Sequence, residues 1–504
     1  MLAKVWSCAI VGLDAIPIEV EVDIASQGLP CFTIVGLPDK AVEESRERVR
    51  SALKNSGADF PAKRITVNLA PADLPKEGPS YDLPIAIGIL LASGQLQDQM
   101  SEAFFTGELS LNGDVRPISG ILSQVLLARE RHIKQFFLPV GNAPEAAYIF
   151  GVDIYPVTSL KELFLHLTCE KLITKQEQNA IDFETEKQIF TYDLKDIHGQ
   201  EQAKRALEIA AAGGHNILLK GPPGAGKTLL ARTLPSILPN MTYSEMIEVT
   251  KIYSIAGMLP EKGVIFIRPF RSPHHTTSLV GLIGGGTIPK PGEISLAHRG
   301  VLFLDELPEF PKIILESLRQ PLEDGVAYIS RSHGRVTFPT KCMVVAAQNP
   351  CPCGYFGDKL HTCTCSPMSV LRYKKRISGP LLDRIDIHLE VPAVKIEKLA
   401  TNTTSSESSE TVRKRVQFAR DIQSKRFAGT TLTNNADMTS KDLKYFCPVS
   451  EDCLTLLHTA LEKLHLSARS YHRIIKLSRT IADLEQTNQI LPQHIAEALQ
   501  YRPL

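Results

Sequence analysis

The chain has neither a long apolar run nor an excess of charge, and both absences narrow what it can be. No stretch approaches the ~18 consecutive apolar residues that a membrane-spanning helix needs. The short apolar stretch near the N-terminus is soon followed by Asp14, Glu19, Glu21 and Asp23, a pattern unlike a secretory signal. We therefore expect a cytoplasmic protein that does not enter a membrane.

Positive and negative charges nearly cancel. The 504 residues have a formal net charge of +1, so any binding to nucleic acid must come from local patches. With 43% hydrophobic residues, a chain of this length is expected to form about three domains. Two polar stretches, 171–190 and the Ser/Thr-rich 396–410, predict linkers between domains at 1–170, 191–395 and 411–504.

The most specific motif is a phosphate-binding loop. It directly follows the apolar run 216–220, which predicts the strand–loop–helix context that the motif requires. Its glycines let backbone N–H groups surround phosphate oxygens, Lys227 can reach the β- and γ-phosphates, and the Thr228 hydroxyl can bind Mg²⁺. The motif predicts binding of ATP with Mg²⁺. The sequence matches G-x-x-x-x-G-K-[ST] at every fixed position, and the motif consists of Gly221, Pro222, Pro223, Gly224, Ala225, Gly226, Lys227 and Thr228.

A second motif predicts the rest of the magnesium site. The apolar run 301–304 is typical of a strand buried on both faces, and it ends in Asp305 and Glu306. Ligands of open α/β sheets bind at the carboxyl ends of the strands. We therefore expect Asp305 to hold the Mg²⁺ and Glu306 to orient the attacking water.

Hydrolysis needs further polar groups to meet the charge that develops on the γ-phosphoryl group. A third buried strand, 343–348, is followed by Asn349, whose amide can position the water; an ordinary strand-end turn is the alternative. Further along, Arg384 stands among acidic residues. On this pattern alone it is either a catalytic arginine or a surface ion pair.

Four of the ten cysteines lie within fifteen residues, with the spacing C-x-C-x₉-C-x-C. Thiolates at this density in a cytosolic chain favour a structural metal such as Zn²⁺ over disulfides. The C-x-C spacing is tighter than the usual zinc knuckle, so reduced thiols and a redox disulfide stay open as alternatives. The cluster consists of Cys351, Cys353, Cys363 and Cys365.

The segments GPPGAGKT, VLFLDE, AAQNPCPCG and LLDRID, followed by residues 467–473, resemble the AAA+ ATPases. Within them the chain resembles the branch of magnesium chelatase subunit I and the MCM helicases, and most closely the ComM (YifB) competence proteins, over nearly its whole length. The resemblance implies an α/β fold: an N-terminal Lon-protease-like α+β domain, a central AAA+ P-loop NTPase domain and a C-terminal helical lid.

The resemblance also implies roles for single residues. Asn349 corresponds to sensor 1 and Arg384 to an arginine finger that acts on the nucleotide of the neighbouring subunit. Arg469 corresponds to sensor 2, with Arg473 as a second candidate. A finger supplied by a neighbour implies a ring, expected to be a homo-hexamer. Residues 267–271 and 281–286 correspond to a mobile helix-2 insertion that points into the pore.

Residues 75–80 resemble the nucleophile motif of Lon, with Ser80 at the catalytic serine. A serine nucleophile needs a base, but the lysines of the matching Lon segment fall on Leu122 and Gln124. Only an unaligned residue such as Lys76 would be left to take the proton. We therefore expect a pseudo-protease domain that serves ring assembly or DNA.

Two strand patterns, 325–330 and 335–339, flank a turn and predict a β-hairpin that matches the pre-sensor-1 hairpin. Arg331, His333 and Arg335 at its tip can bind DNA phosphates, unless the tip is simply solvated. The resemblance implies an ATP-dependent DNA motor: a branch-migration helicase, acting on single-stranded and branched DNA with recombination proteins as partners, in natural transformation and homologous recombination. The alternative is a magnesium-chelatase-like protein-remodelling ATPase.

Overall fold

In a computed structural model of the chain, the contacts divide the protein into two units. Unit 1 comprises Met1–Thr185 and Met246–Ile265, and unit 2 comprises Glu186–Glu245 and Phe266–Leu504. No helix among the described residues is both long and apolar enough to cross a membrane. The structure describes residues 2–97, 102–179, 190–287, 289–331, 334–358, 361–393, 407–464 and 467–502.

Unit 1 is built on a seven-stranded mixed sheet with the order β3-β4-β2-β1-β5-β8-β9. In β2, the apolar residues Ile18, Val20 and Val22 are fully buried, whereas the acidic residues that alternate with them face outward. Helix α2 is buried along its whole length against β1 and β2. The strands are β1 (Leu2–Val11), β2 (Asp14–Ile24), β3 (Cys31–Val35), β4 (Arg64–Ala70), β5 (Ala103–Phe105), β8 (Gln135–Pro139) and β9 (Asp153–Val157), and the helices α1 (Lys40–Asn55), α2 (Asp82–Ala92), α3 (Ile121–Glu130) and α5 (Leu160–Leu167).

Unit 2 is built on a five-stranded parallel sheet with the order β11-β14-β17-β10-β18. Because all strands run the same way, the residues that follow β10, β14 and β17 meet at one edge of the sheet. The strands are β10 (Ile217–Lys220), β11 (Phe270–Arg271), β14 (Val301–Leu304), β17 (Met343–Gln348) and β18 (Ile387–Glu390), and the helices before the C-terminal group include α6 (Glu201–Gly213), α7 (Lys227–Thr233), α11 (Lys312–Ser317), α12 (Arg319–Asp324), α13 (Pro367–Lys374) and α14 (Gly379–Leu382).

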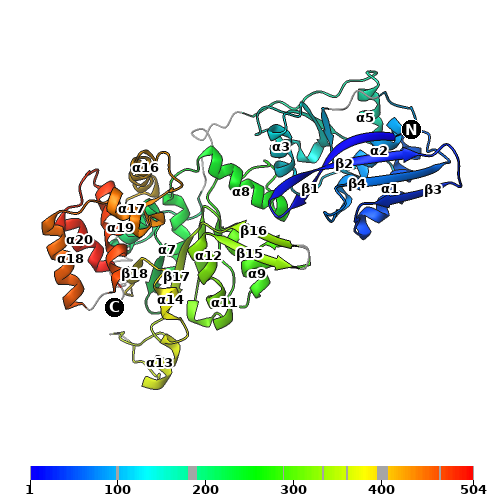
Figure 1. The fold of residues 1–504 in the computed structure, drawn as a ribbon. Coiled ribbons are helices and arrows are strands. Elements are labelled where there is room, and N and C mark those ends of the chain that lie inside the picture. The colour runs from blue at the N-terminus through cyan, green and yellow to red at the C-terminus, as the bar shows by residue number, and fades with distance from the viewer. Residues whose placement is uncertain are drawn as a thin grey trace. The chain divides into compact units, whose positions relative to one another are not determined.

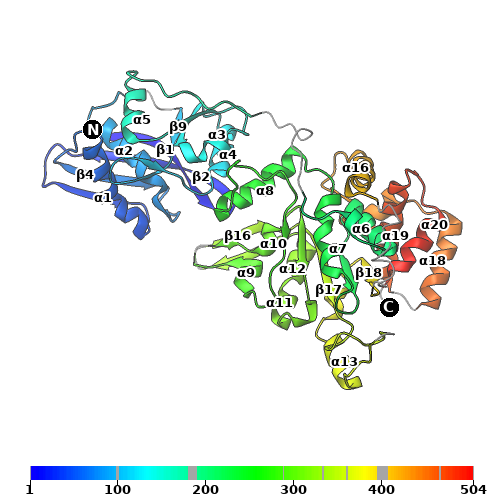
Figure 2. The same ribbon diagram turned by 180° about the vertical axis from the view of Figure 1, so that it is seen from behind.

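The C-terminal helices share one hydrophobic core with this sheet. Ile217, Val345 and Ile387 of the sheet pack in the same cluster as Val416 and Ile481 of the helices. Figure 1 shows α17 to α20, in orange and red, grouped at one side of the sheet, and Figure 2 shows α18, α19 and α20 together from behind. The group consists of α16 (Ser409–Arg426), α17 (Ser440–Phe446), α18 (Glu451–Lys463), α19 (Ala468–Leu484) and α20 (Pro492–Ala498).

The two units differ from the predicted domains in three places. The predicted C-terminal domain, 411–504, belongs to the same unit as the central domain. Residues 171–179, part of the predicted first linker, pack within unit 1, where Ile173 is buried and the Gln176 N–H donates to the Ile154 carbonyl oxygen. Residues 246–265 also fold with unit 1, although they lie between the two nucleotide motifs in the sequence. Of the predicted second linker, 396–410, residues 396–406 lie outside the described residues.

The expected mobile insertion is wrong for residues 267–271. Phe270–Arg271 is strand β11, which pairs with β14 inside the central sheet. Arg268 is held by the Pro239 and Arg299 carbonyl oxygens, each at 2.7 Å from its guanidinium nitrogens. A basic, Gly- and Pro-flanked segment was expected to be flexible, but tertiary acceptors for its arginine fix it in place.

Candidate nucleotide site

The phosphate-binding loop joins the buried strand β10 to helix α7. Gly224 and Gly226 have φ angles of 75° and 85°, in the left-handed region that glycine adopts without strain. Gly221 is needed for a different reason, because a Cβ atom there would lie 2.1 Å from the Val391 carbonyl oxygen after β18. The loop therefore depends on glycine for both its conformation and its packing.

Lys227 is buried at the start of α7, with its ammonium group inside the loop. Its Nζ donates to the Gly221 and Pro222 carbonyl oxygens at 2.7 and 2.8 Å, and to Asn349 Oδ1 at 3.1 Å. Burial lowers the pKa of Lys227, and the nearby carboxylates of Asp305 and Glu306 oppose that shift. The acidic pair thus favours the charged ammonium that phosphate binding requires.

The predicted magnesium ligands lie together. The Thr228 hydroxyl donates to Asp305 Oδ2 at 2.8 Å, and Asp305 Oδ1 accepts from the Glu306 N–H at 2.9 Å. Glu306 has a φ angle of 50°, which is uncommon for a residue other than glycine and costs conformational energy. A hydroxyl and a carboxylate within hydrogen-bond distance are oxygen donors that fit Mg²⁺.

Three neighbouring strands bring these side chains together. β17 lies between β10 and β14 in the sheet, so Asn349 leaves its strand beside both nucleotide motifs. Its amide oxygen accepts from Lys227. The residues expected at the ATP site are therefore adjacent in one unit, and their catalytic roles stay predictions.

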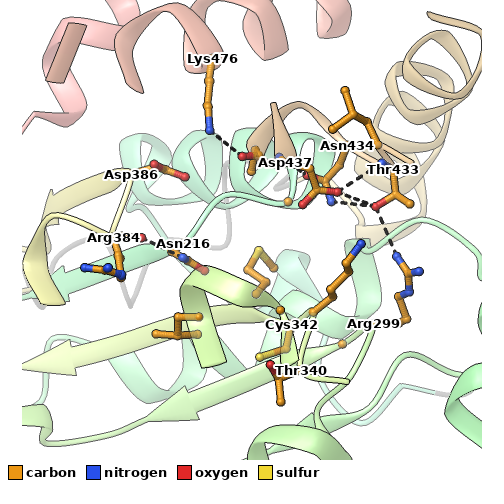
Figure 3. Close-up of a pocket in the computed structure, with 18 of the residues that line it drawn as sticks. Asn216, Arg299, Thr340, Cys342, Arg384, Asp386, Thr433, Asn434, Asp437 and Lys476 are labelled. Atoms are coloured by element: carbon orange, nitrogen blue, oxygen red, sulfur yellow. Dashed lines mark hydrogen bonds between the residues drawn. The ribbon is translucent and has the colours of Figure 1, made fainter. Parts of the chain in front are cut away.

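Arg384 lies at the opposite edge of the same sheet. The Asn216 side-chain amide, just before β10, donates to the Arg384 carbonyl oxygen at 2.8 Å, and Figure 3 shows the two residues side by side. The Arg384 guanidinium donates to Glu323 and, at 2.7 Å, to the Pro380 carbonyl oxygen. Four residues of β10 rise about 13 Å between this edge and the phosphate-binding loop.

The two sensor 2 candidates contact the segment that carries Arg384. Arg469, in the first turn of α19, donates to Asp383 Oδ2 at 3.1 Å. Arg473 donates to the Asp383 carbonyl oxygen at 2.7 Å, and its guanidinium is 3.7 Å from Asp386. Both arginines thus adjoin the predicted finger rather than the phosphate-binding loop.

A cavity of about 590 Å³ opens at this amino edge of the sheet. Its lining includes Asn216, Arg299, Arg384, Asp386 and Lys476 (Figure 3). Several of its charges are already paired within the chain: Asp386 accepts from the buried His215, and Glu245 accepts from Arg268. The cavity is therefore polar but largely self-neutralised.

The four clustered cysteines converge in space. Cys351 Sγ is 3.4 Å from Cys353 Sγ and 3.7 Å from Cys363 Sγ, and all four sulfur atoms lie within 4.8 Å of one another. A disulfide requires about 2.05 Å, whereas tetrahedral zinc with Zn–S bonds near 2.3 Å separates its sulfurs by about 3.8 Å. Backbone N–H groups of Cys353 and Phe356 point at the sulfurs of Cys365 and Cys351. The geometry fits a four-thiolate metal site.

This cysteine loop abuts the phosphate-binding loop, a contact that motif reading missed. A Cβ atom at Gly354 would lie 2.5 Å from the Pro223 side chain, and Gly354 has a φ angle of 86°. The only signal in the sequence was that the first cysteine pair directly follows Asn349. The cysteine loop thus forms a wall beside the ATP site.

Three family models match the chain in order. "Subunit ChlI of Mg-chelatase" matches residues 20–142, "Magnesium chelatase, subunit ChlI" matches 193–399, and "Magnesium chelatase, subunit ChlI C-terminal" matches 406–502. The competence protein ComM of Haemophilus influenzae is 47% identical over 508 residues, covering 100% of this chain and 98% of ComM. The YifB protein of Escherichia coli is 43% identical over 504 residues, covering 100% and 97%.

The chain belongs to the ComM and YifB family. A shorter similarity, 29% identity over 149 residues, links it to Lon protease 2 of Bacillus subtilis and covers 28% of this chain and 27% of that protease. Together the matches confirm the predicted family and the predicted fold class, with a Lon-like part, an AAA+ domain and a helical C-terminus.

The structure describes the three positions that bear on the serine of the Lon-like motif. Leu122 and Gln124 are both buried on α3. The Lys76 ammonium, the remaining candidate, is buried and donates to the Pro71 carbonyl oxygen. That the Lon-like part is a pseudo-protease stays a prediction.

The predicted hairpin is confirmed as β15 (Val326–Arg331) paired antiparallel with β16 (Gly334–Pro339). Arg335 is exposed and stacks over the Tyr328 ring, with its guanidinium carbon 3.9 Å from the ring centroid. His333 and the side chain of Arg331 lie outside the described residues. The part of the tip that is described therefore presents one arginine supported by an aromatic ring.

Proposed function

We propose that this protein is an ATP-hydrolysing ring motor that moves branched DNA during the integration of incoming single-stranded DNA. The observation that carries ATP use is the contact set at the sheet edge, where Lys227 meets Asn349 and Thr228 meets Asp305. The DNA substrate is supported by the 47% identity to a protein named for competence.

Each residue at this edge has a defined task in hydrolysis. The loop glycines present N–H groups to phosphate oxygens, and Lys227 exchanges the loop carbonyls for the β- and γ-phosphates. Thr228 and Asp305 hold Mg²⁺, which neutralises phosphate charge when it is bound. Glu306 polarises the attacking water, and Asn349 fixes the position of that water.

The opposite edge supplies the remaining charge to a second copy. Arg384 is separated from its own phosphate-binding loop by the full length of β10, so it acts on the nucleotide of a neighbouring subunit. Arg469 acts with Arg384, because Arg469 donates to the side chain of Asp383, which directly precedes Arg384 in the chain. A closed ring satisfies every site at once, and we propose a homo-hexamer.

DNA contact is assigned to the hairpin of β15 and β16. The Arg335 guanidinium lies over the Tyr328 ring, and this contact limits its conformational freedom before it meets a phosphate. Arg331 and His333 are its proposed partners at the tip. Such contacts add affinity that is independent of sequence and sensitive to salt.

The cysteine cluster is proposed to hold one structural Zn²⁺. The sulfur separations and the two N–H···S contacts fit four thiolates around one ion. Zinc there would fix Gly354 against Pro223 and so support the phosphate-binding loop. The role is structural, because four protein ligands leave no open position.

A magnesium-chelatase-like remodelling ATPase is the second candidate. It is favoured by the three family models, which are all described by the chelatase subunit. Such an enzyme would act on a partner protein and would not depend on DNA.

One experiment separates the two candidates. ATP turnover is measured without DNA, with single-stranded DNA and with a four-way junction, and strand exchange on the junction is followed in the same samples. Glu306→Gln, which is expected to bind ATP without turnover, provides the blank. We expect DNA to stimulate turnover and strand exchange to require ATP. Turnover that ignores DNA, with no strand exchange, would instead support the remodelling ATPase.

A further inference from the structure

One helix of the chain belongs to both units. Helix α8 (Tyr243–Ala256) starts in unit 2, and from Met246 onward it belongs to unit 1, as does the return segment to Ile265. The segment 243–268, which we name the coupling strap, therefore leaves the ATPase sequence and comes back to it. Its helix spans about 21 Å at 1.5 Å per residue.

The far part of the strap is docked on unit 1 by a buried polar cluster. The Ser254 hydroxyl donates to Glu145 Oε2 at 2.7 Å and accepts from the Gly120 N–H at 3.1 Å. Asn142 donates to Glu145 Oε1 at 2.8 Å. Glu145 is 3% exposed and Ser254 2% exposed. A buried carboxylate is costly unless donors surround it, so the cluster specifies where the strap sits.

The return segment of the strap meets the same residue. A Cβ atom at Gly263 would lie 2.5 Å from the Glu145 backbone nitrogen, and Gly263 has a φ angle of 76°. The Ile265 N–H donates to the Thr250 hydroxyl at 3.2 Å, which ties the returning segment to α8. Both segments of the strap are thus fixed around Glu145.

Arg268 joins the two ends of the strap within unit 2. Its guanidinium donates to Glu245 at 2.7 Å and to the Pro239, Asn240 and Arg299 carbonyl oxygens. The Arg268 and Glu245 side chains are only 10% and 14% exposed. The first turn of α8 and the end of the return segment are therefore held together as one neck in unit 2.

The neck connects to both nucleotide motifs. On one side, the chain runs back through the turn η4 (Leu234–Ile237) to α7, which begins at Lys227. On the other side it runs into β11, which pairs with β14, the strand that ends at Leu304, directly before Asp305. Short elements therefore connect the neck to both motifs.

We propose that the coupling strap carries nucleotide-dependent movement of the ATPase unit into the Lon-like unit, with Glu145 as the positioning residue that holds it. A helix anchored at both ends transmits displacement, whereas a helix released at one end does not. The inference rests on the proposed ATP use, but it does not require that the substrate be DNA.

The test compares anchor variants by amide hydrogen exchange of peptides from residues 119–146, with and without a non-hydrolysable ATP analogue. In the wild-type protein we expect the analogue to change exchange at least threefold. Glu145→Ala and Ser254→Ala should lose this response, while Glu145→Gln, which keeps an acceptor, should retain most of it. The matched control is Asp14→Ala, which breaks the Lys251–Asp14 pair of 2.8 Å, whose carboxylate is 83% exposed; it should respond like the wild type.

A second measurement separates coupling from stability. Basal ATP turnover of Ser254→Ala should stay within twofold of wild type, while strand exchange per ATP hydrolysed should fall about tenfold. The proposed role of the strap is rejected if the ATP analogue still changes amide hydrogen exchange in both Ser254→Ala and Glu145→Ala. It is also rejected if the analogue does not change hydrogen exchange in the wild-type protein. If the analogue changes amide hydrogen exchange in the wild-type protein but the protein exchanges no DNA strands, the role of the strap is retained and the proposed DNA motor is rejected. If Glu145→Ala does not fold, Ser254→Ala, which removes only a hydroxyl, decides the test.

Discussion

At its carboxyl ends the parallel sheet of unit 2 meets Lys227, Thr228 and Asp305, whereas at its amino ends it meets Asn216 and Arg384. The first edge collects groups that bind phosphate and metal. The second collects arginines that are paired with Glu323 and Asp383. Strand β10 separates the two edges. This separation is the basis for our proposal that the chemistry is divided between copies of the chain.

The strongest test of the first edge is Lys227→Ala. We expect ATP turnover to fall by ~10³-fold or more, a larger effect than the removal of one hydrogen-bond donor to the transition state. The reason is that the substitution removes both nucleotide binding and charge stabilisation. ATP binding is measured by fluorescence of a labelled nucleotide and turnover by phosphate release. Lys220→Ala is the matched control, since the Lys220 side chain, at the end of β10, pairs with the exposed Glu390 at the end of the neighbouring strand β18. Tight ATP binding by Lys227→Ala would contradict the assignment.

Arg384→Ala tests the second edge. Turnover should fall by ~10³-fold, the usual scale for an arginine finger, while ATP binding is kept. Mixing this variant with Lys227→Ala should restore part of the activity, because some interfaces then combine an intact loop with an intact finger. Arg116→Ala, an exposed arginine of unit 1, is the control. Mixed rings that recover no activity would reject action across the interface.

Asn349→Ala sharpens the comparison within the first edge. Since its amide contacts Lys227 and not the arginines, we expect turnover to fall by ~10²-fold with ATP affinity little changed. Mixing with Arg384→Ala should also restore activity, because the two lesions lie at opposite edges. If Asn349→Ala behaved as wild type, its position would be an ordinary strand-end turn.

The smallest effect is expected at the cysteine loop. Cys363→Ser should lower bound zinc from about one per chain to near zero, by elemental analysis. ATP affinity should fall about tenfold, or 1.4 kcal/mol, because Gly354 is no longer held against Pro223. Cys31→Ser, an exposed cysteine of unit 1, is the control. Wild-type protein without metal would leave reduced thiols or a disulfide as the state of the cluster.

Much of unit 2 was predictable because its signals are local. The apolar runs at 217–220, 301–304 and 343–348 are strands, and Ser467 caps helix α19 in the part of the chain expected to form a helical lid. Strand order was not predictable from these runs. Only the order of the sheet makes β17 the neighbour of both β10 and β14 and brings Asn349 to Lys227.

Unit 1 shows where local signals fail. Helix α8 has an ordinary sequence for a buried helix, and nothing in it indicates which domain it joins. Its Ser254 hydroxyl donates to the Glu145 carboxylate within unit 1, and these two residues are 109 positions apart in the sequence. Likewise, residues 267–271 looked mobile, because a sequence does not show which carbonyl oxygens will accept from Arg268.

The sequence by itself determined the phosphate-binding loop, the acidic strand end, the hairpin and the family, because each depends on residue types at fixed spacing. Tertiary structure alone decided that Arg384 and Lys227 lie at opposite edges, that the cysteine loop lies against Pro223, and that residues 246–265 of the coupling strap belong to unit 1. These relations depend on packing between residues far apart in the chain, where hydrogen-bond partners and close backbone contacts are fixed only when the chain folds.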